Sequence, residues 1–307
     1  MKKYLLFVLF LTFHTPIILL AQDQLLQGEV YDKVTHKPLH LATIILMKAE
    51  VACNTTIDGV FSLQSPKVDL SDTLWVSCDG YQPAKVPINQ FVNNWVISLQ
   101  KNTLKKRPKS QIKTNNKVEL NNLSNERLRH FTGIERWLEP FNYIQLAQKF
   151  NAPSVNSKLK KITVQLYISL YQPMHDSCMF RVHVYDMDKS TEGPGAELTE
   201  EGILVKSYAR INVKVNIPDI HISGKNFFVS IEWLRIPFNR ADIQNEIYVP
   251  RDRGSFKNKM FKPIIGMSNK KGEFINTWAM NFKHEWQLYT YFVPYLTDFA
   301  ISAEVEY

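Results

Sequence analysis

Acidic residues in one loop of the sequence have a spacing from which a metal site can be built. Asp186, Asp188 and Glu197 place oxygen donors at positions one, three and twelve of a calcium-loop pattern. Thr191 stands where an EF-hand needs glycine, and the flanking segments alternate like strands, so an EF-hand is excluded. A Ca²⁺ site on a sandwich loop is one interpretation. We prefer a polar hairpin shaped by Gly-Pro-Gly at residues 193–195.

Catalytic motifs are absent from the sequence. His284-Glu285 begins like a metalloprotease helix, but Leu288 stands where the second histidine is needed. There is no Gly-x-Ser-x-Gly elbow, glycine-rich phosphate loop or dinucleotide fingerprint. The sequence therefore predicts a protein that is not an enzyme. A hydrolase with an unrecognised site, pairing acids such as Glu232 and Glu285 across a cleft, is kept as an alternative.

Aromatic residues crowd the last third of the chain. Trp278, Trp286 and Tyr289 lie among polar residues, and flat rings exposed on a β-sandwich can stack on sugars. These three residues are the candidate ligand-binding residues, with a glycan as ligand. The competing interpretation is that the rings fill the core between two sheets.

The N-terminal elements consist of short runs rich in Val, Ile, Leu, Thr and aromatic residues, separated by regular turn signals. At the clearest turn, Asp58 and Gly59 bend the backbone, and Phe61 and Leu63 then share one strand face. Such a pattern predicts an all-β sandwich. The seven expected strands span 26–31, 40–48, 51–56, 60–64, 73–78, 82–87 and 94–99.

Four motifs in this order carry a family resemblance: Gly28-Glu29-Val30, Pro38-Leu39 with Ala42-Thr43-Ile44, Thr56-Ile57-Asp58-Gly59-Val60-Phe61, and Gly80-Tyr81. The stretch resembles the carboxypeptidase regulatory-like domain, a transthyretin-like β-sandwich abundant in exported proteins of Bacteroidota. We assign residues 23–100 to it. The resemblance implies a folding and binding module, and no catalytic residue is carried over.

The rest of the sequence predicts a connecting segment followed by a second, larger β-sandwich. Residues 101–120 are a basic linker, and residues 121–140 a short helical connector with the helix near 124–138. Alternating runs then predict strands at 161–168, 180–185, 211–217, 227–234 and 299–307, whereas 143–150 fits helix or strand. This C-terminal domain, 141–307, resembles a jelly-roll-type β-sandwich.

The first 22 residues have the charged start and interrupted apolar stretch of a cleaved secretory signal peptide. No later stretch is long enough to span a bilayer as a helix. The formal charge of +8 is concentrated in the linker, which carries seven basic residues between 101 and 117, so a nucleic-acid partner is not expected. Export would permit a Cys53–Cys78 disulfide. We prefer the interpretation that all three cysteines, including Cys178, are small buried apolar residues.

Together these features predict an exported, non-enzymatic protein of the cell envelope, located in the periplasm or at the cell surface. It would act as a binding or assembly module with an envelope protein or a glycan as partner. The alternatives are a carbohydrate-binding protein that uses the C-terminal aromatics, and the hydrolase described above. No cofactor is expected apart from the Ca²⁺ considered for the 186–197 loop.

Overall fold

The computed structural model describes residues 24–66, 68–88, 94–102, 116–122, 128–134, 141–166, 177–208, 211–218, 220–242, 259–270, 275–291 and 296–307. The predicted signal peptide and most of the predicted linker lie outside these residues. Within them, regular structure is strand throughout, apart from one 3₁₀ turn, η3 (Pro237–Asn239). The all-β prediction is confirmed. No helix in the described ranges has the length and hydropathy that crossing a membrane requires.

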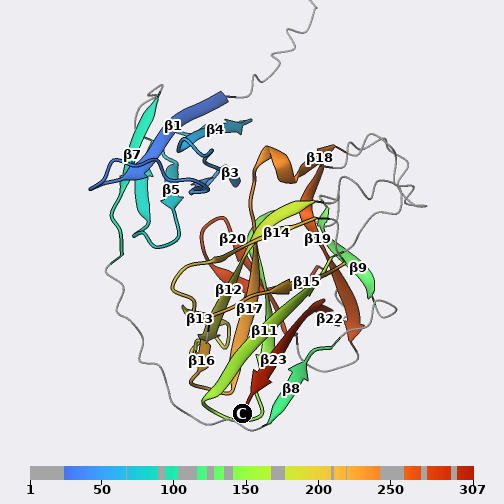
Figure 1. Cartoon of the computed structure of the whole chain (residues 1–307). Coiled ribbons are helices and arrows are strands. Elements are labelled where there is room, and N and C mark those ends of the chain that lie inside the picture. The colour runs from blue at the N-terminus through green and yellow to red at the C-terminus, as the bar shows by residue number, and fades with distance from the viewer. Residues whose placement is uncertain are drawn as a thin grey trace, which may run out of the picture.

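The N-terminal domain is a sandwich of two sheets, seen at the blue end of the chain in Figure 1. The sheets have the strand orders β4-β1-β7 and β3-β2-β5-β6, and side chains from both form one core. The strands are β1 (Gln24–Asp32), β2 (Thr43–Leu46), β3 (Val51–Asn54), β4 (Val60–Ser65), β5 (Thr73–Ser77), β6 (Ala84–Pro87) and β7 (Trp95–Leu99). All seven predicted strands are present, with ends shifted by a few residues.

The turn before β4 is held by Gly59 in a left-handed conformation. Gly59 has φ of +74°, its carbonyl accepts the Val30 N–H at 2.8 Å, and its own N–H donates to Thr56 O at 3.0 Å. A Cβ at this position would lie 2.5 Å from Val30 O. The turn delivers Phe61 and Leu63 into the core, where both are buried. Its role is structural, as the sequence predicts.

Replacing Gly59 with alanine is therefore expected to destabilise the protein by about 1–3 kcal/mol, because the side chain adds both backbone strain and a collision with Val30 O. Urea unfolding of the full chain measures the change. Asp58→Ala, at the exposed neighbouring position, is the matched control and should shift stability by no more than about 0.5 kcal/mol. Equal stability of the two variants would contradict this role of Gly59.

The three cysteines are free thiols. Cys53 lies on β3, and Cys78 follows β5, while β2 runs between these two strands. Two strand spacings amount to about 10 Å, more than the roughly 7 Å limit between the Cα atoms of a disulfide. Cys53 and Cys78 pack against the N-terminal core and Cys178 belongs to the C-terminal core. Burial raises the pKa of Cys53 to about 12, which fits the interpretation of these residues as apolar packing groups.

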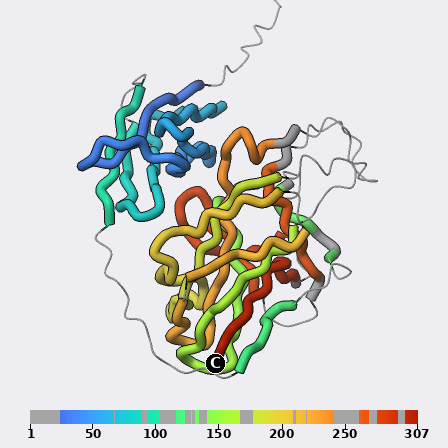
Figure 2. Tube along the Cα trace, viewed as in Figure 1, coloured from blue at the N-terminus to red at the C-terminus, as the bar shows by residue number. Residues whose placement is uncertain are grey.

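The C-terminal domain contains three sheets, and Figure 2 shows the path of its chain from green to red. The seven-stranded sheet comprises β10 (Tyr143–Asn151), β12 (Cys178–Met187), β13 (Pro194–Glu197), β14 (Ile203–Ser207), β17 (Asn226–Trp233), β20 (Thr277–Asn281) and β21 (Trp286–Leu288). The five-stranded sheet comprises β8 (Lys117–Leu120), β11 (Ser157–Gln165), β15 (Asn212–Val215), β16 (Ile220–Ile222) and β23 (Ile301–Glu306). The four-stranded sheet comprises β9 (Leu128–Ile134), β18 (Arg240–Asp242), β19 (Lys259–Lys270) and β22 (Leu296–Phe299). Side chains from all three contribute to one large core.

The helix predicted near 124–138 is wrong in its described part. Leu128–Ile134 forms β9, which pairs antiparallel with β19. Gly133 has φ of +95°, which a right-handed helix cannot contain, and its Cα packs against the carbonyls of Phe261 and Pro263. Pairing with the long strand β19 outweighs the weak local preference for a helix. Residues 124–127 and 135–138 lie outside the described residues.

The C-terminal domain also begins earlier than predicted. Lys117–Leu120, assigned to the end of the basic linker, form the edge strand β8 beside β23. The Lys117 ammonium lies 3.0 Å from Glu306 Oε1 on that neighbouring strand. Part of the positive charge attributed to the linker is therefore paired on a folded sheet.

Candidate functional site

One face of the seven-stranded sheet is polar although it is buried. Along β12, Phe180, Val182 and Val184 enter the core, so the alternating residues Arg181 and His183 point to the opposite side. We call this opposite side the outer face. It is made by Arg181, His183 and Tyr185 of β12, Phe228, Ser230 and Glu232 of β17, Gln145 and Ala147 of β10, and Trp278 of β20.

At the centre of the outer face, His183 is held between two carboxylates. Its Nδ1 lies 2.7 Å from Glu197 Oε1 and its Nε2 lies 2.9 Å from Glu232 Oε2. Since both partners accept, both ring nitrogens carry a proton and the ring is an imidazolium. Burial alone would lower the pKa of His183, but the hydrogen bonds and charges of Glu197 and Glu232 raise it to about 10. A histidine in this state cannot act as a general base at neutral pH.

Arg181 continues this cluster toward the N-terminal domain. Its Nε lies 2.6 Å from Asp79 Oδ2, its Nη2 donates to Leu41 O at 2.9 Å, and its Nη1 lies 3.4 Å from Glu232 Oε1. The Thr43 hydroxyl donates to the same Glu232 oxygen at 2.9 Å. Burial would raise the pKa of Glu232, but Arg181 and His183 hold it at about 2. We call Asp79, Arg181, His183, Glu197 and Glu232 the ionic cluster.

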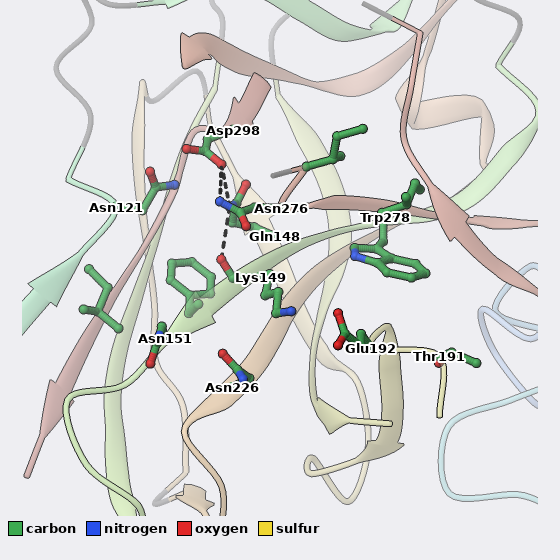
Figure 3. A pocket seen from close by; sticks show the side chains of 14 residues that line it. Asn121, Gln148, Lys149, Asn151, Thr191, Glu192, Asn226, Asn276, Trp278 and Asp298 are labelled. Carbon is green, nitrogen blue, oxygen red and sulfur yellow. Dashed lines mark hydrogen bonds between the residues drawn. The ribbon is translucent and has the colours of Figure 1, made fainter. Parts of the chain in front are cut away.

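A pocket of about 850 Å³ opens beyond the other end of the outer face, beside Trp278 (Figure 3). Its polar lining comes from the ends of β10 and β17, from the residues next to β8 and β20, from the turn between β12 and β13, and from β22. These residues are Asn121, Gln148, Lys149, Asn151, Thr191, Glu192, Asn226, Asn276 and Asp298. Leu120, Phe150, Ile275, Trp278 and Leu288 complete the wall.

The polar groups of this pocket fall into two sets. Gln148 donates to Asp298 Oδ1 at 2.9 Å and accepts the Phe299 N–H at 2.8 Å, so its position is fixed by the fold. Asn151 and Asn226 form the last register pair of β10 and β17, and their amide groups stand at the pocket rim (Figure 3). Such amides offer both donors and acceptors to a ligand.

The three aromatic candidates do not form one surface. Trp278 lines the pocket but is only 9% exposed, because Gly193 packs on its six-membered ring and Phe228 meets it edge to face. Trp286 is half-buried against Tyr185, with ring centroids 5.6 Å apart. Tyr289 was assigned wrongly to a binding surface, because it is buried in the core of the domain. Trp278 is thus a wall of the pocket, without a free stacking face for a sugar.

The oxygen donors of the 186–197 loop do not come together in one site either. Asp188 accepts the N–H groups of Ser190 and Thr191 and closes its own turn, while Glu197 lies against His183. Among the described residues, no group of three metal-ligating side chains has the geometry of a metal site. The Gly-Pro-Gly segment follows the turn and starts β13, which agrees with the preferred interpretation of a polar hairpin.

The paired acids of the hydrolase alternative are not brought together either. Glu232 is buried and neutralised by Arg181 and His183, whereas Glu285 lies on an exposed turn, where it accepts from Asn281 Nδ2 at 3.1 Å. The two carboxylates therefore do not form the pair that this alternative requires.

Sequence reasoning missed Arg181 and His183, and it missed the pocket amides. A signal for the first two was present, because two ionisable residues alternate with core residues in one strand. The pocket amides come from four distant segments, and nothing in their local sequence marks them.

No family model matches the sequence, and no curated protein is significantly similar to it. Solved structures that share limited structural similarity with the chain include two of Cwp84. One contains the cysteine protease and lectin-like domains of Cwp84, a surface layer associated protein of Clostridium difficile: 12% identity, TM-score 0.29, 54% of this chain and 32% of that chain covered. The other is a single-residue variant of the clostridial cysteine protease Cwp84 after propeptide cleavage: 10% identity, TM-score 0.36, 83% and 57% covered. The chain thus spans less than two thirds of either structure.

Proposed function

We propose that this protein is an exported, non-enzymatic module of the cell envelope whose C-terminal domain binds a glycan in the pocket beside Trp278. The observation that carries the proposal is the pocket: amides are five of its nine polar lining side chains, and its volume of about 850 Å³ lies in the range of small-molecule sites. Sugar hydroxyls both donate and accept hydrogen bonds, and amides match them in both roles.

The charges of the pocket support a neutral or weakly charged ligand. Lys149 offsets one of the two acids Glu192 and Asp298, so the charged side chains of the lining leave a formal charge of only −1. Leu288 and the edge of Trp278 provide apolar contact for the C–H groups of a sugar. The predicted signal peptide and the resemblance to an exported regulatory-like domain support a place in the envelope. The proposed absence of catalysis rests on the missing motifs and on the neutralised state of Glu232.

Glycan microarrays followed by calorimetry on the chain from residue 23 test this function. Asn151→Ala combined with Asn226→Ala is expected to weaken binding roughly 30-fold, because two hydrogen bonds of about 1 kcal/mol each are removed. Asn212→Ala, an exposed amide on β15, is the control and should leave affinity unchanged.

Two results would count against the proposal. One is a wild-type protein that binds no glycan on the array. The other is a double variant that retains full affinity for a glycan bound by the wild type, which would place the ligand elsewhere. Turnover of the bound glycan would overturn the non-enzymatic assignment.

A further inference from the structure

The outer side of the β3-β2-β5-β6 sheet lies against the C-terminal domain. Every residue of β2 is buried: Ile44 and Leu46 enter the N-terminal core, whereas Ile45 packs on Ile144 and Phe282 of the C-terminal domain. Trp75 stacks on His284, with ring centroids 4.3 Å apart. A strand that faces its own core on one side and a second domain on the other has no solvent-exposed side.

Polar contacts fix the orientation of this interface. The Asn54 side chain accepts the Arg235 N–H at 2.6 Å, and Thr43 donates to Glu232. Gly80, at the turn after Asp79, lies so close to Glu201 that a Cβ would come within 2.6 Å of its carboxylate. The turn at Asp79-Gly80 therefore lies in close contact with the C-terminal domain.

The ionic cluster is complete only when both domains are present. Without the N-terminal domain, Arg181 would lose its closest carboxylate, Asp79, and the Leu41 carbonyl, and would keep only the longer contact to Glu232. Glu232 is itself shared with His183. Docking of the N-terminal domain therefore supplies Arg181 with its closest carboxylate and with a carbonyl acceptor, both in a site shielded from water.

We propose that the N-terminal domain is an intramolecular binding partner of the C-terminal domain, held through Asp79–Arg181 and the Ile45 contact, and that the two remain bound without a covalent connection. This goes beyond glycan binding and does not depend on it. The sequence predicted two domains joined only by a linker, whereas this proposal joins them through a specific interface. In that arrangement the N-terminal domain covers the Arg181 end of the outer face.

The test uses the full chain with a specific protease site inserted between Asn102 and Asn116. After cleavage, the two fragments are expected to co-elute in size-exclusion chromatography with light scattering at the mass of one chain. Asp79→Asn is expected to weaken the association of the fragments about 30-fold or more, because it leaves Arg181 buried without its closest charge. Asp69→Asn, which removes an exposed contact to Lys48 at 4.0 Å, is the control and should leave the association unchanged.

Ile45→Ser supplies a second variant, because within the N-terminal domain this side chain lies outside the core and its loss should weaken docking without unfolding the sandwich. Circular dichroism of each cleaved variant checks that both fragments are folded. Separation of the cleaved wild-type fragments at micromolar concentration would overturn the proposal. So would association that survives both substitutions, or a complex with the mass of two chains, in which the partner is another copy.

Discussion

Glu232→Gln is expected to lower the free energy of unfolding by about 3–5 kcal/mol, the range found when one partner of a buried ion pair is removed. The carboxylate accepts from Arg181, His183 and Thr43 at once, and all of these partners are donors. An amide brings its own N–H donors to that position and carries no charge. Two buried cations would then share the remaining carboxylates Asp79 and Glu197.

Urea unfolding of the full chain measures this effect. Glu285→Gln is the matched control in the same domain, since Glu285 lies on an exposed turn and its loss should cost no more than about 0.5 kcal/mol. If the two variants were equally stable, the ionic cluster would not contribute to folding, and the interface proposal would lose its main support.

The stability of the protein is expected to fall between pH 7 and pH 8.5 because of His183. The pKa of His183 is raised from 6.5 to about 10 in the folded protein, so the folded state keeps a proton that the unfolded chain releases above about pH 6.5. The stabilisation is complete below pH 6.5 and is lost as the pH rises toward 10. One such proton makes the free energy of unfolding fall by about 1.4 kcal/mol per pH unit. Between pH 7 and pH 8.5 the loss is therefore about 2 kcal/mol.

Unfolding curves of the wild type and of His183→Gln at several pH values test this slope. The charged groups around the ring are Glu197 and Glu232 on either side, with Arg181 beside Glu232, so a glutamine removes the titrating group and leaves the others in place. The variant is expected to be less stable at pH 7 and to lack the slope. His221→Gln, on β16, should keep it. Parallel slopes in all three proteins would show that His183 is not protonated as proposed.

The N-terminal domain could be predicted from sequence because its determinants are local. Gly59 fixes one turn, and the alternation of Phe61 and Leu63 assigns the face of the next strand. The run Ile44-Ile45-Leu46 falls within the expected strand 40–48, but the sequence did not tell what covers Ile45. That answer lies in Ile144 and Phe282, which are remote in the chain.

The C-terminal domain was harder to predict because long-range pairing determines its elements and sites. Leu128–Ile134 becomes a strand through its pairing with β19, and Tyr289 enters the core although Leu288 and Thr290 on either side of it are exposed. The pocket is assembled when Asn151 and Asn226 meet across a strand pair that closes 74 intervening residues. No local pattern encodes such a meeting.

The buried strand β2 has a consequence for how the chain matures. A polypeptide is made from its N-terminus, so the first sandwich can fold once residue 99 has been added, whereas Thr43 must wait for Glu232, which lies 189 positions away. During that interval Ile45 and Trp75 face solvent as an apolar surface on a finished sheet. A chain interrupted before β12 would carry this surface permanently and is expected to self-associate, whereas a complete C-terminal domain covers it.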